Sequence, residues 1–392
     1  MFKFNSNLLN INYENSFQRL SDEVNNFKLN NLNTNLISLS IGDVSLPVIE
    51  PVVDKMKEAV EDLSSEKTFK GYGGYLGYDF LKSVIREHEY KNFNISLDEI
   101  YISDGAKSDT TNILELFDIN SRICVADPMY PVYKNGASVL NRNVTLLKGF
   151  NNDDFLPRVP LEKFDIIYMC SPSNPIGIVY PKSYLEEWVN YALENNSIIL
   201  YDNVYSDFIN SKDAVKSIYE IENAKKVAIE FRSFSKSISF TGVRCSYYVI
   251  PNDIDKDINK LWKLRTINRF NGASYIAQKG ALAIYSDEVQ QLISNNIKYY
   301  LDNARYLKDA FLKSGFKVWG GTDSPYLWIQ IKDGRSSWEE FYYFLNNLGI
   351  VIVPGIIFGD EGNRYFRVSS LGKREDVMIA VKRISDFYEK EA

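Results

Sequence analysis

From about residue 98 onward, short apolar runs alternate with segments in which apolar residues recur at helical spacing. Helical patterns cover residues 104–117 and 181–196. The apolar runs, rich in β-branched and aromatic residues, lie at residues 99–103, 122–127, 164–170, 197–205, 225–234 and 245–251. Near-continuous apolar strands separated by helices are typical of a mostly parallel sheet that helices cover on both faces. The pattern predicts an α/β fold with a large, doubly wound domain.

After about residue 280 the pattern changes. One long amphipathic segment, residues 286–315, precedes separated apolar runs and a terminal helical stretch. This order predicts a smaller α+β domain, which residues near the N-terminus join. The chain has no repeat, low-complexity tract or Pro/Gly-rich linker, so we expect the domains to pack together. The predicted division is 36–280 for the large domain, with 1–35 and 281–392 forming the small one.

Composition narrows the class of protein. The 392 residues exceed the length at which one core keeps growing, and 45% hydrophobic with 24% charged residues is ordinary globular usage. A net charge of −6 argues against nucleic acid as a partner, because phosphate binding needs a basic field. The N-terminus lacks the apolar stretch of a signal peptide, and no apolar run is long enough to cross a bilayer. We therefore expect a cytoplasmic protein.

Cysteine and histidine usage excludes several chemistries. Cys124, Cys170 and Cys245 lie in or beside apolar runs and lack metal-ligand spacing, which indicates buried, reduced thiols. The single histidine, His88, falls on what reads as the charged face of a helix. Zinc sites with several histidines are thus excluded, and a Ser-His-Asp triad is disfavoured. Chemistry must come from Lys, Tyr, Asp, Arg or a cofactor, and we predict no metal.

Ligands of such sheets bind at the carboxyl ends of the strands, so the loops there are the place to search. Gly105 and Ala106, in "SDGAKSD", leave backbone N–H groups open at a helix start, where an anion can bind. Tyr130, in "DPMYP", could stack on a planar ligand, and Asn174, in "SPSNPIG", is an amide held between prolines. Taken singly, each also fits an ordinary turn.

Charged residues at other strand ends are harder to explain by turns. Asp202 ends the apolar run of "ILYDNVY", and a buried carboxylate is costly without a cationic partner, although a helix cap is an alternative. Lys236 and Arg244, in "RSFSKSISFTGVR", have no acid near them, which favours a solvated loop or an anion pocket. A desolvated lysine amine can react with an aldehyde. Arg367, inside the strand pattern "YFRVSS", needs an anion, and its planar fork suits a carboxylate.

The set of residues is more specific than its members. A pyridinium aldehyde phosphate needs a reactive lysine, a cationic phosphate contact, a carboxylate for the ring nitrogen, a phenol for the ring oxygen and an aromatic stack. The chain supplies these groups in the order of that list as Lys236, Arg244, Asp202, Tyr205 and Tyr130. Arg367 remains for a substrate carboxylate. The sequence predicts pyridoxal 5'-phosphate as cofactor.

Residues 36–392 resemble fold-type I pyridoxal-phosphate aminotransferases, and within them the LL-diaminopimelate aminotransferase group. The motifs that carry the resemblance are "LSIGDVSLP", "GYGGYLGY", "ISDGAKSD", "DPMYPVY", "CSPSNPIG", "YDNVY", "SFSKSISFTGVR", "RFNGAS", "PYLWIQI", "PGIIFG" and "FRVSSLGKRED". The resemblance implies a homodimer with shared active sites. It implies catalytic roles for Lys236, Asp202 and Tyr205. The implied cofactor-binding set is Gly105, Ala106, Lys107, Tyr130, Asn174, Asp202, Tyr205, Ser233, Ser235, Lys236, Arg244 and, from the neighbouring subunit, Tyr72. The implied substrate-binding set is Gly42, Lys107, Asn174, Arg367 and, at the shared site, Tyr75 and Asn271.

Departures from the group concern the distal end of the substrate. After "GYG" the group places an acidic residue for the distal ammonium, and here Tyr75 stands there. An N-terminal segment that usually supplies a tyrosine has Asn15 as its nearest counterpart, and "CSY" replaces "LGW" after Arg244. Losing the carboxylate leaves a buried ammonium unpaired. Either another acid such as Asp43 compensates, or the substrate is changed, for example to an aromatic or apolar one. We favour the changed substrate.

The predicted activity is a ping-pong exchange of an amino group between an L-amino acid and a 2-oxo acid, with glutamate and 2-oxoglutarate as the expected second pair. Three alternatives stay open. One is genuine LL-diaminopimelate aminotransferase activity in lysine biosynthesis. Another is a lyase or decarboxylase that uses the same residues. The third is a cofactor-binding regulator, which the acidic charge disfavours.

Overall fold

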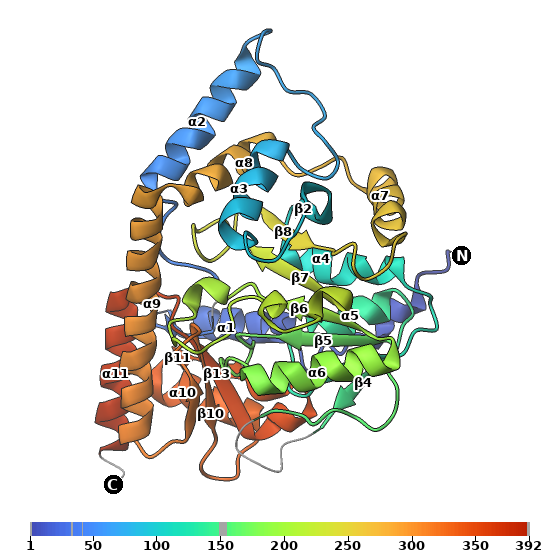
Figure 1. The fold of residues 1–392 in the computed structure, drawn as a ribbon. Helices are drawn as coiled ribbons and strands as arrows, with labels where there is room; N and C mark the ends of the chain where they lie inside the picture. Colours follow the sequence, from blue (N-terminus) through green and yellow to red (C-terminus); the bar gives the residue numbers. More distant parts are fainter. Residues whose placement is uncertain (1, 33, 41, 149–154, 390–392) are drawn as a thin grey trace.

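The computed structural model describes residues 2–32, 34–40, 42–148 and 155–389. Seven strands form the large sheet, in the order β2-β8-β7-β6-β5-β3-β4, and all but β8 run parallel (Figure 1). Their bounds are β2 Ile100–Ser103, β3 Ile123–Ala126, β4 Val144–Leu147, β5 Ile166–Cys170, β6 Ile198–Asp202, β7 Ala228–Ser233 and β8 Ser246–Val249. The predicted mostly parallel α/β sheet is confirmed.

Helices cover both faces of the large sheet, because alternate side chains of each strand point to opposite faces. On β5, Ile167 and Met169 pack into one core and Tyr168 and Cys170 into the other. The first core includes α2 Glu50–Ser64, α3 Asp79–Glu89, α6 Lys182–Asn195 and α8 Tyr275–Leu282. The second includes η3 Ile113–Leu116, which continues α4 Ala106–Asn112, and also α5 Val132–Val139 and α7 Ile258–Arg269.

Strand β8 is the one antiparallel member among the described strands of the large sheet. The loop 234–245 that joins β7 to β8 consists of turns and contains no helix. A parallel neighbour needs a crossover connection, usually a helix, whereas a loop of turns returns the chain antiparallel. The apolar run at 245–251 predicted the strand but left its direction open. Strand β4, within "NVTLL", was missed, although its β-branched residues are typical of strands.

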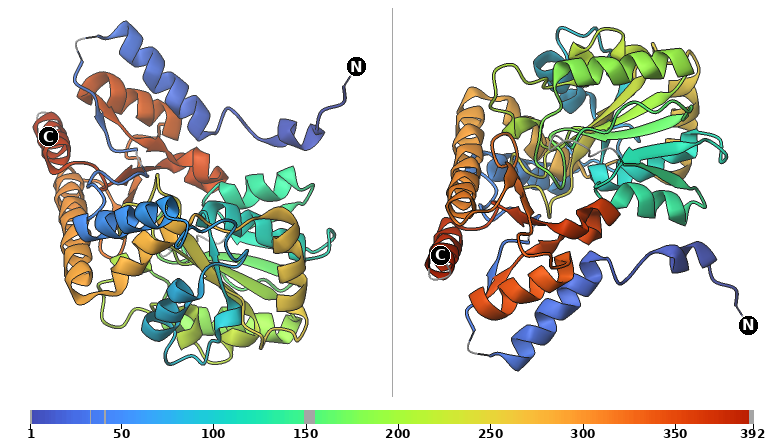
Figure 2. Two further views of the ribbon diagram at one scale, coloured as in Figure 1. Left: turned by 90° about the horizontal axis from the view of Figure 1, so that it is seen from above. Right: turned by 90° about the horizontal axis from the view of Figure 1, so that it is seen from below.

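The C-terminal part forms a second core. Its antiparallel sheet has the order β12-β13-β10-β9, and a parallel pair β1-β11 lies beside it. The strands are β1 Ile37–Ser38, β9 Val318–Gly320, β10 Tyr326–Gln330, β11 Ile350–Val351, β12 Val353–Pro354 and β13 Tyr365–Ser369. The helices are α1 Phe17–Asn30, α9 Asp287–Lys313, α10 Ser337–Leu348 and α11 Arg374–Tyr388. Figure 2 shows α1 lying alongside α10, so N-terminal residues do complete this core.

The pairing of β1 with β11 bears on where the domains divide. Strand β1 lies at residues 37–38 but belongs to the smaller sheets, whereas α8 packs on the large sheet. The division at 36 and 280 therefore stays a prediction, and we infer that the first crossing between the lobes lies after β1.

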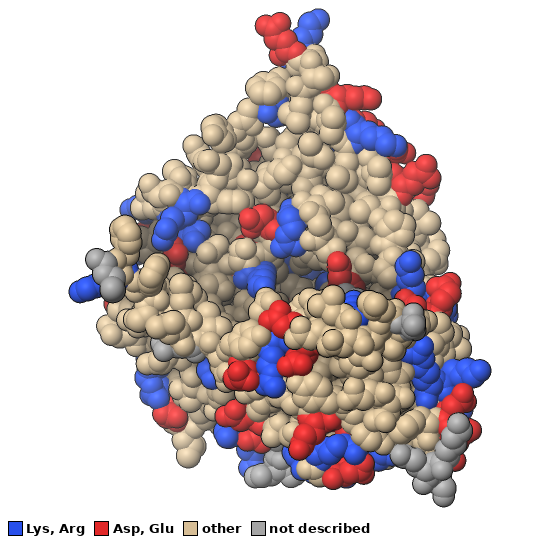
Figure 3. Space-filling model, turned by 180° about the vertical axis from the view of Figure 1, so that it is seen from behind, with Lys and Arg blue, Asp and Glu red and all other residues tan. Residues whose placement is uncertain are grey.

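Figure 3 shows the opposite side of the molecule, where basic and acidic side chains are interspersed around a hollow. No helix of the described residues is long and apolar enough to span a membrane.

Candidate active site

A cavity of about 490 Å³ opens at the carboxyl ends of β5, β6 and β7, where the two lobes meet. Most predicted site residues line it. These are Gly42, Ala106, Lys107, Tyr130, Asn174, Asp202, Tyr205, Ser233, Ser235, Lys236, Arg244 and Arg367. They come from loops far apart in the sequence, which parallel strands bring to one edge of the sheet. Gly105 lies directly behind them, while Tyr72, Tyr75 and Asn271 are not among the lining residues.

Lys236 lies in the loop after β7, and its Nζ donates a hydrogen bond to the carbonyl oxygen of Gly42. Burial lowers the pKa of this amine to about 8; nearby Asp43 raises it, while Arg367 and Arg244 lower it. A pKa of about 8 leaves roughly a tenth of the amine neutral at pH 7. Only a neutral amine has the lone pair that attacks a carbonyl carbon. The site thus provides a nucleophilic lysine.

Asp202 is the last residue of β6 and is buried beneath the cavity. Its Oδ2 accepts a hydrogen bond of 2.5 Å from the hydroxyl of Tyr133, and its Oδ1 accepts one of 3.3 Å from the backbone N–H of Val204. Burial raises the pKa of Asp202 to about 6, and the Tyr133 hydrogen bond limits the rise. The carboxylate can therefore be ionised at neutral pH and hold a ring N–H⁺ group.

Phenol groups surround the middle of the cavity. The hydroxyls of Tyr205 and Tyr326 lie 2.9 Å apart, and both rings are buried. Tyr130 meets the ring of Tyr133 edge to face, with centroids 5.8 Å apart. Burial raises the pKa of Tyr130 to about 12, so its phenol stays protonated at neutral pH. These groups can donate hydrogen bonds to an anionic ring oxygen and stack on a planar ring.

The end of the cavity near α4 has the properties of an anion site. Gly105, at φ +149°, precedes α4, and a Cβ there would overlap the guanidinium of Arg244. Arg244 donates 3.1 Å to the carbonyl oxygen of Thr241, and no ion pair of the described residues includes Arg244 or Lys107. The hydroxyls of Ser233 and Ser235 lie 3.0 Å apart beside them. Unpaired cations, hydroxyls and open helix N–H groups together fit a phosphate.

Arg367 lies on β13, at the opposite end of the cavity, with 2% of its surface exposed. It donates 2.7 Å to Oδ1 of Asn174 and 3.2 Å to the carbonyl oxygen of Ser40, and its Nε has no hydrogen-bond partner within the described part of the chain. The rings of Tyr326 and Phe358 lie 4.3 and 4.8 Å from Cζ. No carboxylate of the described residues forms an ion pair with it. A buried guanidinium without a carboxylate is suited to bind one from a ligand.

Three predicted residues lie together outside the cavity. Tyr72 and Tyr75 are 87% and 40% exposed, and Asn271 is also exposed. A Cβ at Gly272 would lie 2.8 Å from the carbonyl oxygen of Gly74, so the two segments are in contact. Their role at the site of a neighbouring subunit stays a prediction.

The N-terminal segment reaches the site through a residue that the sequence did not indicate. Asn15, the counterpart considered for a substrate-contacting tyrosine, accepts a hydrogen bond of 3.3 Å from Nε1 of Trp338 and does not line the cavity. Phe17, at the start of α1, lines it instead. Its ring meets Phe358 edge to face at 5.7 Å. The N-terminal segment therefore brings the apolar ring of Phe17 to the cavity, where a tyrosine was expected.

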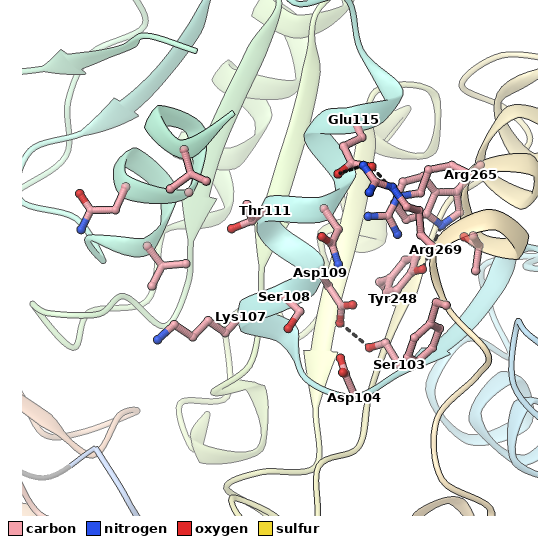
Figure 4. A pocket seen from close by; sticks show the side chains of 18 of the residues that line it. Ser103, Asp104, Lys107, Ser108, Asp109, Thr111, Glu115, Tyr248, Arg265 and Arg269 are labelled. Atoms are coloured by element: carbon pink, nitrogen blue, oxygen red, sulfur yellow. Dashed lines mark hydrogen bonds and ion pairs between the residues drawn. The ribbon is translucent and has the colours of Figure 1, made fainter. Parts of the chain in front are cut away.

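A second cavity of about 720 Å³ lies between α4, α5 and α7 and shares Lys107 with the first. In Figure 4, Glu115 faces Arg265 and Arg269, with ion-pair distances of 3.0 and 3.3 Å. Asp109 lies at its base and accepts a hydrogen bond of 2.5 Å from Ser103. Three of the charges that line this cavity, Glu115, Arg265 and Arg269, are thus paired with one another, and Asp109 is hydrogen-bonded.

Sequence comparison identifies the family. The profile of aminotransferase class I and II matches residues 34–384. The chain belongs to this aminotransferase family. It is 42% identical over 388 residues to an LL-diaminopimelate aminotransferase of Phocaeicola vulgatus, covering 94% of this chain and 95% of that one. A Bacteroides thetaiotaomicron enzyme of the same name is 40% identical, with 95% and 96% covered.

Structural comparison agrees. The L,L-diaminopimelate aminotransferase of Chlamydomonas reinhardtii superimposes with a TM-score of 0.93 at 33% identity, covering 99% of each chain. The chain is thus an aminotransferase of the LL-diaminopimelate aminotransferase group, with the fold-type I architecture and pyridoxal 5'-phosphate as cofactor. The cavity fits this cofactor, since an anion site, a reactive lysine and a buried carboxylate surround space for one planar ring.

Sequence reasoning missed Tyr133 and Tyr326 in this aminotransferase. Tyr133 lies in the first turn of α5, three residues after Tyr130 in "DPMYPVY", so the same motif that indicated Tyr130 also contains the residue that contacts Asp202. Tyr326 begins β10, and nothing local predicts that its hydroxyl meets that of Tyr205, 121 residues away.

Tyr133→Phe should move the acid limb of the activity profile to higher pH, by about one unit. The Tyr133 hydrogen bond holds the pKa of Asp202 down, so its loss lets burial raise that pKa further. Because the ionised carboxylate is the active form, activity near pH 6 should fall several-fold more than activity at pH 8. A pH profile of kcat/KM measures the shift. Tyr168→Phe is the control, since its hydroxyl donates to the carbonyl oxygen of Thr110 instead. Coincident profiles would contradict the assignment.

Proposed function

We propose that this aminotransferase transfers amino groups between an L-amino acid other than LL-diaminopimelate and a 2-oxo acid, with glutamate and 2-oxoglutarate as the second pair. The observation that carries the chemistry is the convergence of Lys236, Asp202 and Arg367 on one cavity of about 490 Å³. The cofactor, when bound, supplies an aldehyde and an electron-accepting ring. The amino donor and the 2-oxo acid would bind this site in turn, each through its carboxylate at Arg367.

The chain's own residues have separate tasks in this proposal. Lys236 would hold the cofactor covalently and would move a proton to and from the substrate Cα. Asp202 holds a proton on the ring nitrogen, and Tyr205 with Asn174 binds the ring oxygen. Tyr130 stacks on the ring. The phosphate contacts are Gly105, Ala106, Lys107, Ser233, Ser235 and Arg244. Arg367, oriented by Asn174 at 2.7 Å, binds the substrate α-carboxylate.

We propose that a homodimer completes this site. Tyr72, Tyr75 and Asn271 lie outside the cavity of their own chain and are exposed, as residues that complete a partner's site would be. Leu261, Leu264 and Ile267 on α7 are each about half exposed and follow helical spacing, so they form an apolar stripe beside the second cavity. We propose that both surfaces face the second subunit, and that the enzyme is cytoplasmic.

The changed substrate follows from the acids that line the cavity. Among the described residues these are only Asp202 and Asp43. Asp202 is committed to the cofactor, and Asp43 is exposed and lies near Lys236. With Tyr75 in place of the distal acid, an ammonium at the far end of a substrate would lack a committed partner, whereas Phe17 and Tyr326 offer apolar contact. The second candidate is LL-diaminopimelate itself, which the relatives of 40–42% identity favour.

Tyr75→Glu should raise kcat/KM for LL-diaminopimelate by about tenfold or more, because a carboxylate then meets the distal ammonium. Tyr75→Gln is the matched control, with the same length and no charge, and it should bring no such gain. Both variants are compared with wild type by steady-state kinetics with 2-oxoglutarate as acceptor. Efficient use of LL-diaminopimelate by wild type, without gain in the glutamate variant, would establish the second candidate instead.

A further inference from the structure

Asp127 is a buried carboxylate that none of the roles above uses. It follows β3 and opens the turn "DPMYP", which carries Tyr130. Its exposed fraction is 0%, and neither carboxylate oxygen makes a hydrogen bond of ordinary geometry to a side chain or backbone group of the described residues. A buried carboxylate without a full set of partners opposes folding. Such a group is retained where it serves function rather than stability.

The carboxylate of Asp127 packs against a loop of the small lobe. Gly359, in the segment between β12 and β13, has φ +137°, and a Cβ there would overlap the Asp127 carboxylate. The backbone N–H of Glu361 favours the charged form of Asp127. Two residues on, the N–H of Met129 donates 2.8 Å to the carbonyl oxygen of Phe358. The turn of the large lobe therefore contacts this loop at two successive residues, Phe358 and Gly359.

This loop lies behind two residues that line the active-site cavity, Arg367 and Phe17. The Phe358 ring lies 4.8 Å from Cζ of Arg367 and 5.7 Å from the ring of Phe17. Phe358 is fully buried, so its position is fixed by its contacts. A shift of this loop would move the ring against which the guanidinium rests. Displacements of about 1 Å around a binding group are enough to weaken binding.

We propose that Asp127 is a positioning residue for substrate binding: its charged carboxylate, which packs against Gly359 and faces the backbone N–H of Glu361, holds Phe358 against Arg367 and so determines how tightly the carboxylates of both substrates bind. The inference rests on the proposed role of Arg367. The same turn carries Tyr130, so one element of the large lobe links the ring-stacking residue to the loop that packs behind Arg367.

The charges around Asp127 predict an unusual combination of effects. Burial raises its pKa to about 6, the Glu361 N–H lowers it, the charges of Asp360 and Glu361 raise it, and Lys148 lowers it. Because the folded pKa lies above that of an unfolded aspartate, ionisation at pH 8 opposes folding. A neutral replacement should therefore leave the unfolding temperature unchanged or raise it at pH 8, while substrate binding weakens. If the contact were merely structural, the replacement would lower both the unfolding temperature and the affinity for substrate.

Asp127→Asn, which preserves shape, is expected to raise KM about tenfold for the amino donor and for the oxo acid at pH 8, with a smaller change in kcat. The absorption spectrum of the cofactor-loaded protein should not change, and the unfolding temperature should be equal or higher. Asp360→Asn is the matched control. It removes the same charge from the exposed part of the same loop and should keep KM within twofold.

A double-variant cycle tests the route through Phe358. Phe358→Ala alone should raise KM, and adding Asp127→Asn to it should change KM by less than a further twofold. Any of three results overturns the proposal. The first is a KM of Asp127→Asn within twofold of wild type, and the second is a double variant whose KM rise equals the product of the two single rises. The third is a fall in unfolding temperature that accompanies the KM rise. If Arg367→Lys raises KM and Asp127→Asn does not, only the positioning role fails; if neither raises it, the carboxylate site itself fails.

Discussion

Lys236→Ala should abolish amino transfer and remove the visible absorption band of the cofactor-loaded protein. We expect turnover to fall by more than about 10⁴-fold, because one amine serves both as the covalent anchor and as the proton carrier. No other lysine of the described residues lies both in the cavity and beside Asp202 and Arg367; Lys107 lies near the phosphate end. Absorption spectra and single-turnover rates with an amino donor measure the two losses.

Lys216→Ala is the control for Lys236→Ala. Lys216 is exposed and lines a surface groove away from the active site. This variant should keep both the visible band and the wild-type rate. A Lys236→Ala protein that retained the band, or that transferred amino groups at more than a few percent of the wild-type rate, would remove the basis for the whole assignment.

Arg367→Lys should lower kcat/KM by about 10²- to 10³-fold for the amino donor and for the oxo acid alike. Both substrates carry a carboxylate, and breaking a buried, paired contact costs about 3–5 kcal/mol. Lysine retains the charge but loses the planar fork that binds two oxygens at once. The cofactor spectrum should stay intact, because Arg367 lies at the opposite end of the cavity from Arg244. Steady-state kinetics with each substrate varied in turn gives the two values.

Arg364→Lys is the matched control, since Arg364 immediately precedes the same strand, is exposed and donates 2.7 Å to the carbonyl oxygen of Gly334. It should leave both values within about twofold of wild type. Loss of activity confined to one of the two substrates in Arg367→Lys would contradict a shared carboxylate site.

The cofactor end of the site was largely predictable from the sequence, for a physical reason. Asp202 ends β6 and Lys236 closely follows β7, and the carboxyl ends of parallel strands meet at one edge. In the sequence, each of these residues is therefore recognisable as a polar residue at the end of an apolar run. Arg367 stood out because an arginine inside a strand pattern must find an anion. The positions of these residues relative to the strands were thus enough to predict that they lie close together.

Other features required the three-dimensional structure. The contact of Asp127 with Gly359 joins two lobes across 232 residues of sequence, and no periodicity encodes it. Phe17 reaches the cavity only because α1 packs on the small lobe. Conversely, the motif holding Tyr75 was visible in the sequence, but its side chain lies outside the cavity of its own chain. Contacts between separate packing units depend on tertiary geometry, which local patterns do not specify.

The most direct test of the central claim is a single half-reaction. Cofactor-loaded protein is mixed with an amino donor alone, and its visible spectrum and products are followed. We predict that the visible band disappears as one equivalent of 2-oxo acid forms per active site, and that adding 2-oxoglutarate restores the band and yields glutamate. Continuous release of ammonia or carbon dioxide without an added oxo acid, or a spectrum that no donor changes, would contradict amino transfer at this site.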